Sequence, residues 1–101
     1  MRDQALYAGL IRLHLLHHAA AGPIFGLGII AELGRHGYQL SPGTLYPMLH
    51  RLEKNGYLSS RRQRVAGRIR RSYRITARGR RALGSAQVKV RELFGELIEG
   101  K

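Results

Sequence analysis

The most informative segment of the chain runs from Ser41 to Leu58 and reads SPGTLYPMLHRLEKNGYL. Its apolar residues fall at positions i, i+3, i+4 and i+7, which is the spacing of one helix face: Leu45, Met48, Leu49 and Leu52. Ser41 can accept a hydrogen bond from an early backbone N–H, and Pro42 suits the first turn because its missing N–H leaves no bond unmade. Asn55-Gly56 marks the helix end, since Gly readily adopts a left-handed conformation. The segment predicts a helix followed by a tight turn.

The opposite face of this helix has an unusual composition. It consists of Gly43, Pro47, His50 and Lys54, bordered by Thr44, Tyr46 and Arg51. Pro47 removes the hydrogen bond to the Gly43 carbonyl and crowds it, at a cost of up to about 3 kcal/mol. Gly43 and Pro47 together make a smooth surface that a groove could approach closely, which indicates a function. The simpler alternative is a kinked helix that faces solvent.

Positive charge is concentrated in the middle of the chain. The 101 residues include 18 Lys and Arg against 6 Asp and Glu, a formal net charge of +12. Residues 41–81 hold twelve basic and one acidic side chain, whereas residues 1–40 carry only +1 and residues 82–101 are neutral. Concentrated basic charge is typical of a surface that binds a polyanion, while a merely solubilising surface would spread it. The distribution therefore predicts nucleic acid as the partner.

Two basic strands are predicted after this helix. Residues 57–64 and 68–75 flank Val65-Ala66-Gly67 and read as a hairpin. One face of the second strand holds Ile69, Tyr73 and Ile75, and the other holds Arg68, Arg70, Ser72 and Arg74. Because Arg71 falls on the apolar face, that face should be open near the hairpin tip. The side chains expected to cluster around the tip, and to contact phosphates or enter a minor groove, are Arg62, Arg64, Arg68 and Arg70.

A short helix followed by a basic hairpin is typical of a winged helix that binds DNA. Helices are also predicted over residues 3–20, with apolar side chains on two sides, and over 25–35, with Leu27, Ile30, Ala31 and Leu33 inward. Residues 38–40 are predicted to form a short strand. The fold class is thus mainly α with a small β-hairpin (α+β), a winged helix-turn-helix with helices at both ends.

The last predicted helix is capped by Thr76 and runs to about Glu99. Its apolar residues recur at intervals of 3, 4, 3 and 4, the spacing of a coiled-coil seam: Leu83, Ala86, Val90, Leu93 and Leu97. The seam predicts a helix that pairs with its symmetry mate in a homodimer. The alternative is a helix that packs only on its own domain. We divide the chain into a DNA-binding domain over 1–78 and a dimerisation helix over 79–101.

Several classes of function are excluded by what the sequence lacks. It contains no Cys, so it has neither disulfides nor thiolate sites, which is compatible with the cytoplasm. No apolar run is long enough for a membrane span, and no signal peptide is evident. We find no nucleophile beside a base, no paired carboxylates and no phosphate-binding Gly loop, so neither an enzyme nor a cofactor is expected. His14 and His18 could share a metal at i, i+4 or titrate near neutral pH, but no acidic residue or Cys joins them locally, so no metal site is predicted.

The sequence resembles the PadR-type winged-helix transcriptional regulators over about residues 6–83. The resemblance rests on the order and spacing of three pieces: SPGTLYP at 41–47, HRLEKNGYL at 50–58, and Gly67 followed by RRSYRIT at 70–76 and Gly79. It implies a homodimer, usually a repressor, whose third helix enters the major groove while the wing follows the backbone or minor groove. It also implies that the C-terminal helix makes the dimer, often with the N-terminal helix, and that a small hydrophobic or phenolic compound releases the operator.

Carried over to this chain, the resemblance implies specific contacts. The residues at the helix start that should approach DNA are Ser41, Gly43, Thr44, Tyr46 and Pro47. Further along the same helix, the candidates for contacts with bases or phosphates are His50, Arg51 and Lys54. The residues that match the family's basic wing are Arg64, Arg68, Arg70 and Arg71. The dimer would add Leu6, Leu10 and Phe94 to the seam. Val90 stands where drug-binding relatives carry an aromatic residue.

Two classes of function remain at this point. One is a dimeric regulator that reads a near-palindromic operator. The other is a basic protein that coats nucleic acid without sequence preference or binds RNA. A membrane-surface protein is disfavoured, because it would need a basic amphipathic helix and the charge here lies mostly in the hairpin.

Overall fold

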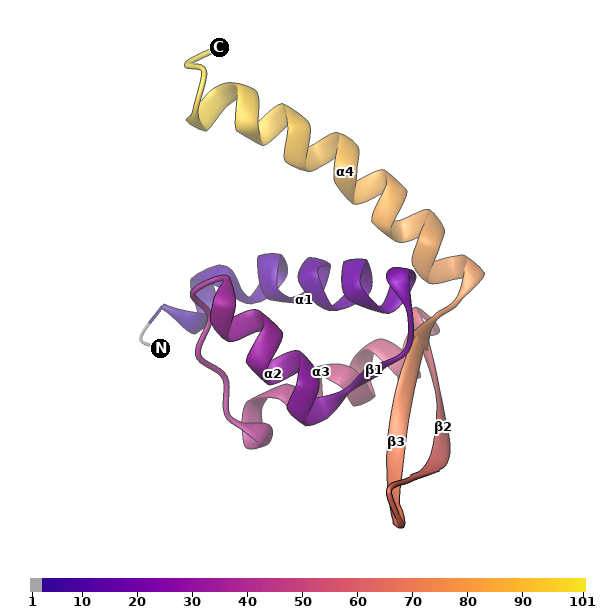
Figure 1. Ribbon diagram of the computed structural model, residues 1–101. Coiled ribbons are helices and arrows are strands. Elements are labelled where there is room, and N and C mark those ends of the chain that lie inside the picture. The colour runs from indigo at the N-terminus through magenta and orange to yellow at the C-terminus, as the bar shows by residue number, and fades with distance from the viewer. Residues whose placement is uncertain (1–2) are drawn as a thin grey trace.

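Four helices and a small antiparallel sheet form the described part of the chain, residues 3–101 of a computed structural model. In chain order the elements are α1 (Gln4–Ala21), β1 (Ile24–Phe25), α2 (Gly26–Arg35), α3 (Pro42–Lys54), β2 (Leu58–Val65), β3 (Arg68–Ile75) and α4 (Ala77–Leu97). Figure 1 shows α1 lying across the helix pair α2–α3, the β2–β3 hairpin projecting to one side, and α4 rising away on the other. This is the predicted winged helix-turn-helix.

The sheet contains one strand that the sequence did not predict. Its order is β1-β3-β2, with Ile24 opposite Tyr73 and Phe25 opposite Ser72. The strand predicted at residues 38–40 is wrong, because this segment is a connection in which the Tyr38 N–H donates to the Leu33 carbonyl at 3.0 Å. The third strand therefore comes from the α1–α2 connection.

The core lies where α1, α2 and α3 meet the base of the hairpin. All four residues of the predicted α3 stripe are buried, and Leu45 and Leu49 have no exposed surface. They pack with Ile11 and Leu15 of α1, Leu33 of α2, and Leu58 and Tyr73 of the sheet. Each fully buried aliphatic side chain contributes about 1.5–3 kcal/mol, so this cluster fixes how α3 is held.

The inward face of α2 differs from the predicted one. Leu27 is 65% exposed and Ala31 is exposed, whereas Ile29 and Leu33 are buried and Ile30 is half-buried. The helix is rotated relative to the expectation, because it is anchored at Gly26 and Ile29 against its neighbours rather than along the Leu27–Ala31 line.

Thr76 joins the end of the hairpin to the start of α4. Its hydroxyl accepts from the Gly79 N–H at 3.0 Å, which is the predicted cap, and donates to the Gly56 carbonyl at 2.6 Å. The Thr76 N–H also donates to the Tyr57 carbonyl at 3.1 Å. These bonds hold α4 and the wing against the turn that ends α3.

Beyond its first turns α4 extends away from the other elements (Figure 1). The described chain, α4 included, measures 53 × 31 × 20 Å. The far half of α4 is exposed, with Val90 at 44%, Leu93 at 46% and Leu97 at 71%. Within residues 3–101, none of the helices combines the length and apolar character that crossing a bilayer would require.

Candidate nucleic-acid interface

The outer face of α3 is the smooth surface that the sequence predicted. Gly43, Pro47, His50, Arg51 and Lys54 are exposed, while Thr44 and Tyr46 at its border are half-buried. Pro42 occupies the first turn, and Gly56 after the C-cap has a φ of 86°, as expected for a glycine helix end.

The predicted cap by the Ser41 side chain is wrong. Ser41 occupies the N-cap position, but its hydroxyl donates to the Thr44 hydroxyl at 3.4 Å instead of accepting from the backbone. The Ser41 carbonyl accepts from the N–H groups of Thr44 and Leu45 at 3.1 and 3.0 Å. Because Pro42 has no N–H, the Gly43 N–H is the group left for another acceptor at this helix start, and the N-terminus of a helix favours anions such as phosphate.

Tyr46 is held between the outer surface and the core. Its ring lies against the backbone of Gly26 at the start of α2, in the space that a Cβ atom there would occupy. On the outer side the Tyr46 and His50 rings lie 6.3 Å apart between centroids. The family resemblance implied a DNA contact for Tyr46, but the sequence did not predict its packing on Gly26, since the two residues lie 20 positions apart.

The pairing of β2 with β3 places the wing arginines on two faces. Residues opposite each other in an antiparallel pair share a face. Ser60 is opposite Tyr73, and Ser60 donates to the Glu53 carboxylate of α3 at 2.5 Å, so this face looks toward α3. Continuing outward with period 2, the residues on the same face are Arg62, Arg64, Ile69 and Arg71.

The expected single cluster at the tip is therefore divided. Arg62 and Arg64 lie on the α3 side, whereas Arg68 and Arg70 lie on the opposite face with Arg61 and Arg74. The apolar face is open near the tip, as predicted, because Ile69 is 65% exposed. The hairpin loop consists of Ala66 and Gly67, with φ of 51° and 78°, so Val65 belongs to the strand. Arg64 and Arg68, next to Val65 and Gly67, still lie close to the end of the wing.

Arg71 links the wing to the core. Burial raises the pKa of the Tyr73 hydroxyl, and the nearby Arg71 guanidinium opposes that rise. Arg71 itself is exposed. By the strand register, Arg71 belongs to the face of the wing that looks toward α3.

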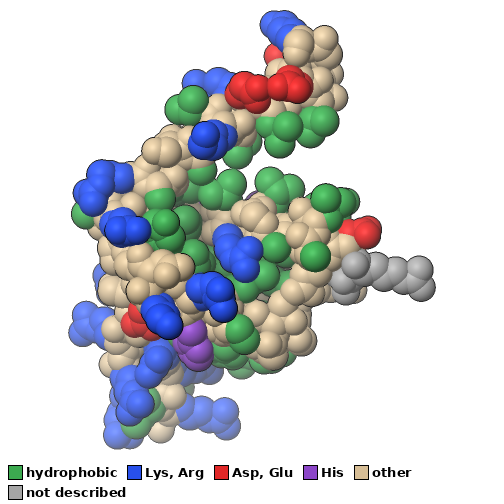
Figure 2. Space-filling view, turned by 180° about the vertical axis from the view of Figure 1, so that it is seen from behind, with side chains coloured by type: hydrophobic (Ala, Val, Ile, Leu, Met, Phe, Trp, Pro, Cys, Tyr) green, Lys and Arg blue, Asp and Glu red, His purple; other side chains and the backbone are tan. Residues whose placement is uncertain are grey.

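In the described part of the chain, no acidic side chain forms an ion pair with the basic side chains of this region. In residues 3–101, ion pairs involve Glu32 with Arg35 and His36, and Glu99 with Lys101. None of the twelve basic side chains of residues 41–81 takes part in one. Figure 2 shows Lys and Arg side chains gathered over the projecting hairpin and continuing along the start of α4. An uncompensated positive surface of this kind attracts a polyanion.

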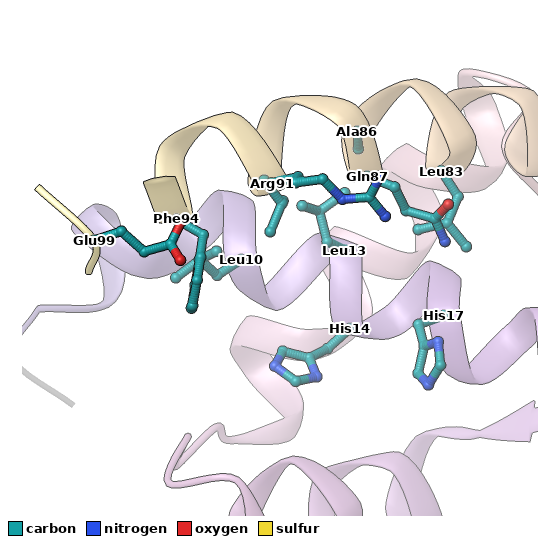
Figure 3. A pocket seen from close by; sticks show the side chains of 11 residues that line it. Leu10, Leu13, His14, His17, Leu83, Ala86, Gln87, Arg91, Phe94 and Glu99 are labelled. Carbon is teal, nitrogen blue, oxygen red and sulfur yellow. The ribbon is translucent and has the colours of Figure 1, made fainter. Parts of the chain in front are cut away.

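A second feature is an open groove of about 910 Å³ between α1 and α4 (Figure 3). Its apolar wall contains Leu10, Leu13, Leu83, Ala86, Val90 and Phe94, and its polar groups include His14, Gln87 and Arg91. Five of the residues expected at a dimer interface line this groove. The other three expected interface residues lie outside the groove lining: Leu6, Leu93 and Leu97. Of these, Leu6 is 75% exposed.

The comparisons with known proteins agree with this architecture. The model of the transcriptional regulator PadR-like family matches residues 15–85. The transcriptional regulator Rv3488 of Mycobacterium tuberculosis is 50% identical over 91 residues, which cover 90% of this chain and 85% of that protein.

Solved structures show the same fold. The crystal structure of a PadR family transcriptional regulator from Eggerthella lenta has a TM-score of 0.82 at 28% identity, covering 99% of this chain and 91% of that one. That of Bacillus subtilis PadR in complex with operator DNA has a TM-score of 0.69 at 20% identity, covering 78% of this chain and 47% of that one. The matched family consists of regulators rather than enzymes. From the family match and the 50% identical relative, this chain belongs to the PadR-like family of transcriptional regulators.

Proposed function

We propose that this regulator binds duplex DNA sequence-specifically in the cytoplasm, with α3 in the major groove and the β2–β3 wing along the backbone or minor groove. The observation that carries the proposal is the unpaired positive charge of residues 41–81 beside an α3 surface made of Gly43 and Pro47. A side-chain-poor helix surface lets a groove approach closely, and the flanking charges neutralise phosphates.

The contacts divide into two kinds. Tyr46, His50 and Arg51 lie along α3 and are candidates for reading base edges, together with the start of the helix at Ser41, Gly43 and Thr44. The wing side chains Arg62, Arg64 and Arg71 lie on the face of the wing that looks toward α3, and Arg68 and Arg70 lie on its opposite face. We assign these arginines to phosphates, because a flexible guanidinium on a projecting hairpin suits the backbone rather than one base.

The functional unit in this proposal is a homodimer. Exposed apolar side chains follow one side of α4, and Leu93 and Leu97 leave 46% and 71% of their surface uncovered. A soluble protein rarely leaves such a seam open, and a second copy of α4 would cover it. Two symmetric α3 helices would then meet half-sites about 34 Å apart on a near-palindrome.

We further propose repression that is relieved by a small hydrophobic or phenolic effector. The groove between α1 and α4 supports this part, since it has the apolar wall and the few polar groups of a ligand pocket. An effector in this groove would contact α1 and α4, the two helices expected to form the dimer interface. A thermal-shift screen of hydrophobic and phenolic compounds, followed by operator release, would test it.

A binding selection from random duplexes tests the DNA proposal. We expect an enriched near-palindrome bound about 10³-fold or more tightly than random DNA. The competing function, a basic protein that coats nucleic acid or binds RNA, would give the same salt dependence but no enriched site. Recovery of random sequence with equal affinity would reject sequence-specific regulation.

A further inference from the structure

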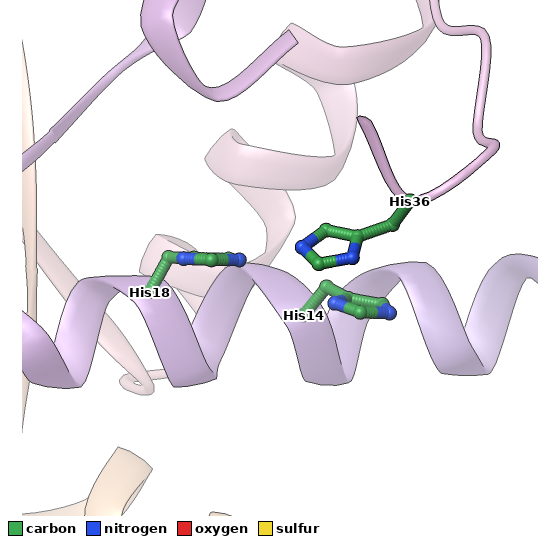
Figure 4. A group of neighbouring side chains, drawn as sticks. All are labelled: His14, His18 and His36. Atoms are coloured by element: carbon green, nitrogen blue, oxygen red, sulfur yellow. The ribbon is translucent and has the colours of Figure 1, made fainter. Parts of the chain in front are cut away.

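Three histidines from two helices meet on the side of α1 that packs against α2. His14 and His18 come from α1, and His36 is the C-cap residue of α2. A ring nitrogen from each lies within 4.8 Å of the others. Figure 4 shows the His14 and His36 rings stacked, with His18 turned toward them. The ring centroids of His14 and His36 are 4.9 Å apart, and those of His18 and His36 are 5.9 Å apart.

These side chains are positioned by two pairs of residues, each pair separated by one helical turn. His14 and His18 lie one turn apart on α1, so their rings project to the same side. On α2, Glu32 and His36 are also one turn apart, and a Glu32 carboxylate oxygen lies 3.6 Å from Nε2 of His36. The His36 N–H donates to the Leu33 carbonyl at 3.0 Å, which closes the last turn of α2.

The His18 ring has no partner in the protein for one of its nitrogens. Its Nε2 atom is buried and makes no hydrogen bond within residues 3–101. A buried nitrogen without a partner is unfavourable, and in native structures such atoms usually bind water or an ion. An open pocket of about 410 Å³ is lined by both His18 and Glu32.

The protonation of the cluster suits a metal ligand set. Burial lowers the pKa of His14, and the neighbouring His36, His18 and His17 lower it further. Burial likewise lowers the pKa of His18, with an added effect of His17. Neutral imidazole is the form that coordinates a metal, so protons compete less here than at an isolated histidine.

We propose that His14, His18 and His36 bind one Zn²⁺ ion. Three imidazoles with water in the fourth position make a complete tetrahedral site, and Zn–N bonds of about 2.0–2.1 Å require ligand nitrogens about 3.4 Å apart. Because His36 is exposed at the end of α2, rotation of its side chain can bring the nitrogens to that spacing. The Glu32 carboxylate orients the His36 ring, as carboxylates beside metal-bound histidines do.

The site would join α1 to the end of α2, the helix that packs against α3. From the sequence, His14 and His18 were the pair considered as metal ligands, since His36 lies 18 positions after His18. The third ligand becomes evident only when the fold brings the end of α2 to α1.

Metal titration of the full chain, without an affinity tag and after removal of metal by a chelator, tests the proposal. Co²⁺ is the spectroscopic probe, and Zn²⁺ is measured in competition with a chromophoric chelator. We expect one ion per chain with a tetrahedral Co²⁺ spectrum that Zn²⁺ abolishes. His36→Gln should lower the affinity by at least about 10-fold, and Glu32→Gln by about 10-fold or more.

His17→Gln is the matched control, because His17 lies on α1 beside His18 but outside the ligand set. It should retain wild-type affinity. His36 is exposed at a helix end, so its replacement should leave the fold intact, which circular dichroism verifies. Zn²⁺ should raise the thermal midpoint of the wild type and of His17→Gln but not of His36→Gln. An absence of binding, or equal affinity in His36→Gln and His17→Gln, would overturn the assignment.

Discussion

The aromatic ring of Tyr46 in α3 occupies the space that a side chain at position 26 would need at the start of α2. A Cβ atom built on Gly26 would overlap the Tyr46 hydroxyl and ring. Gly26 is buried and Tyr46 is half-buried, so the contact lies at the edge of the core. The spacing of α2 and α3 therefore depends on a glycine, and in the proposed complex the angle at which α3 would meet DNA follows from that spacing.

Gly26→Ala should consequently destabilise the protein. The added methyl group must displace the Tyr46 ring, and overpacking of this kind costs about 1–3 kcal/mol. For a chain of this size a loss of 1 kcal/mol lowers the thermal midpoint by about 4–8 °C. Thermal denaturation followed by circular dichroism measures the change.

Gly28→Ala provides the control on the same helix. A Cβ atom at Gly28 would meet nothing within 4 Å, and the residue is exposed. Alanine is the better helix former there, so this variant should be more stable by about 0.5–1 kcal/mol. Destabilisation of equal size in both variants would show that the Tyr46 contact does not limit the packing of α2 on α3.

Removing two charges from the α3-facing side of the wing should weaken binding to every duplex. Arg62 and Arg71 are direct cross-strand partners on that side. If each neutralises one phosphate, the double variant Arg62→Ala plus Arg71→Ala should reduce the slope of log K against log salt by about 1.8. Fluorescence anisotropy at several salt concentrations, on operator and random DNA, measures this slope.

Arg61→Ala plus Arg74→Ala removes the same charge from the same two strands but from the other face. We expect this pair to change the salt slope much less. Equal reductions of the salt slope in the two arginine double variants would reject the proposed orientation of the wing.

Tyr46→Ala, in contrast, should reduce discrimination between operator and random DNA. Equal loss of affinity for operator and random DNA in Tyr46→Ala would reject its base-reading role.

Local pattern was sufficient to predict α3 and its two faces. Leu45, Met48, Leu49 and Leu52 are spaced for one face, and the chain leaves no competing apolar stripe in this segment. The turn after α3 and the hairpin were also predicted, because Gly56 and Gly67 have the positive φ angles that turns of these kinds need.

The sequence-based predictions were wrong where contacts between residues distant in the sequence determine the structure. Strand β1 has two residues and exists through pairing with Tyr73 and Ser72, about 47 positions later in the chain. In α2 nearly every apolar residue could face inward by periodicity, so the choice of Ile29 over Leu27 depends on packing. Period 2 already separated Arg71 from Arg68 and Arg70 within β3, but the face that Arg62 and Arg64 of β2 share with them depends on the strand register, which the sequence alone did not supply.

Leu93→Asp should convert the proposed dimer to a monomer. A carboxylate placed in the seam would be buried against its symmetry mate in an apolar environment, which is strongly unfavourable. Sedimentation equilibrium measures the mass. Val88→Asp is the matched control, since Val88 is 69% exposed on α4 and falls outside the 3-4-3-4 seam. A wild-type mass for Leu93→Asp, or dissociation of both variants, would reject this seam.

The stability of the metal-free protein should fall as the solution is acidified. Burial lowers the pKa of His14 and His18 below 6.5 in the folded state, so the unfolded chain takes up protons first. Stability is therefore fully present above the unfolded pKa and decreases as the pH falls from about 7.5 toward the lower folded pKa. Thermal midpoints measured in a chelator from about pH 7.5 to 5.5 should show this decline. His14→Gln should make it shallower, whereas His50→Gln on α3, outside the cluster, should retain it. A midpoint that is flat with pH in the wild type, or a decline that His14→Gln leaves unchanged, would mean that these imidazoles are not held neutral by the fold.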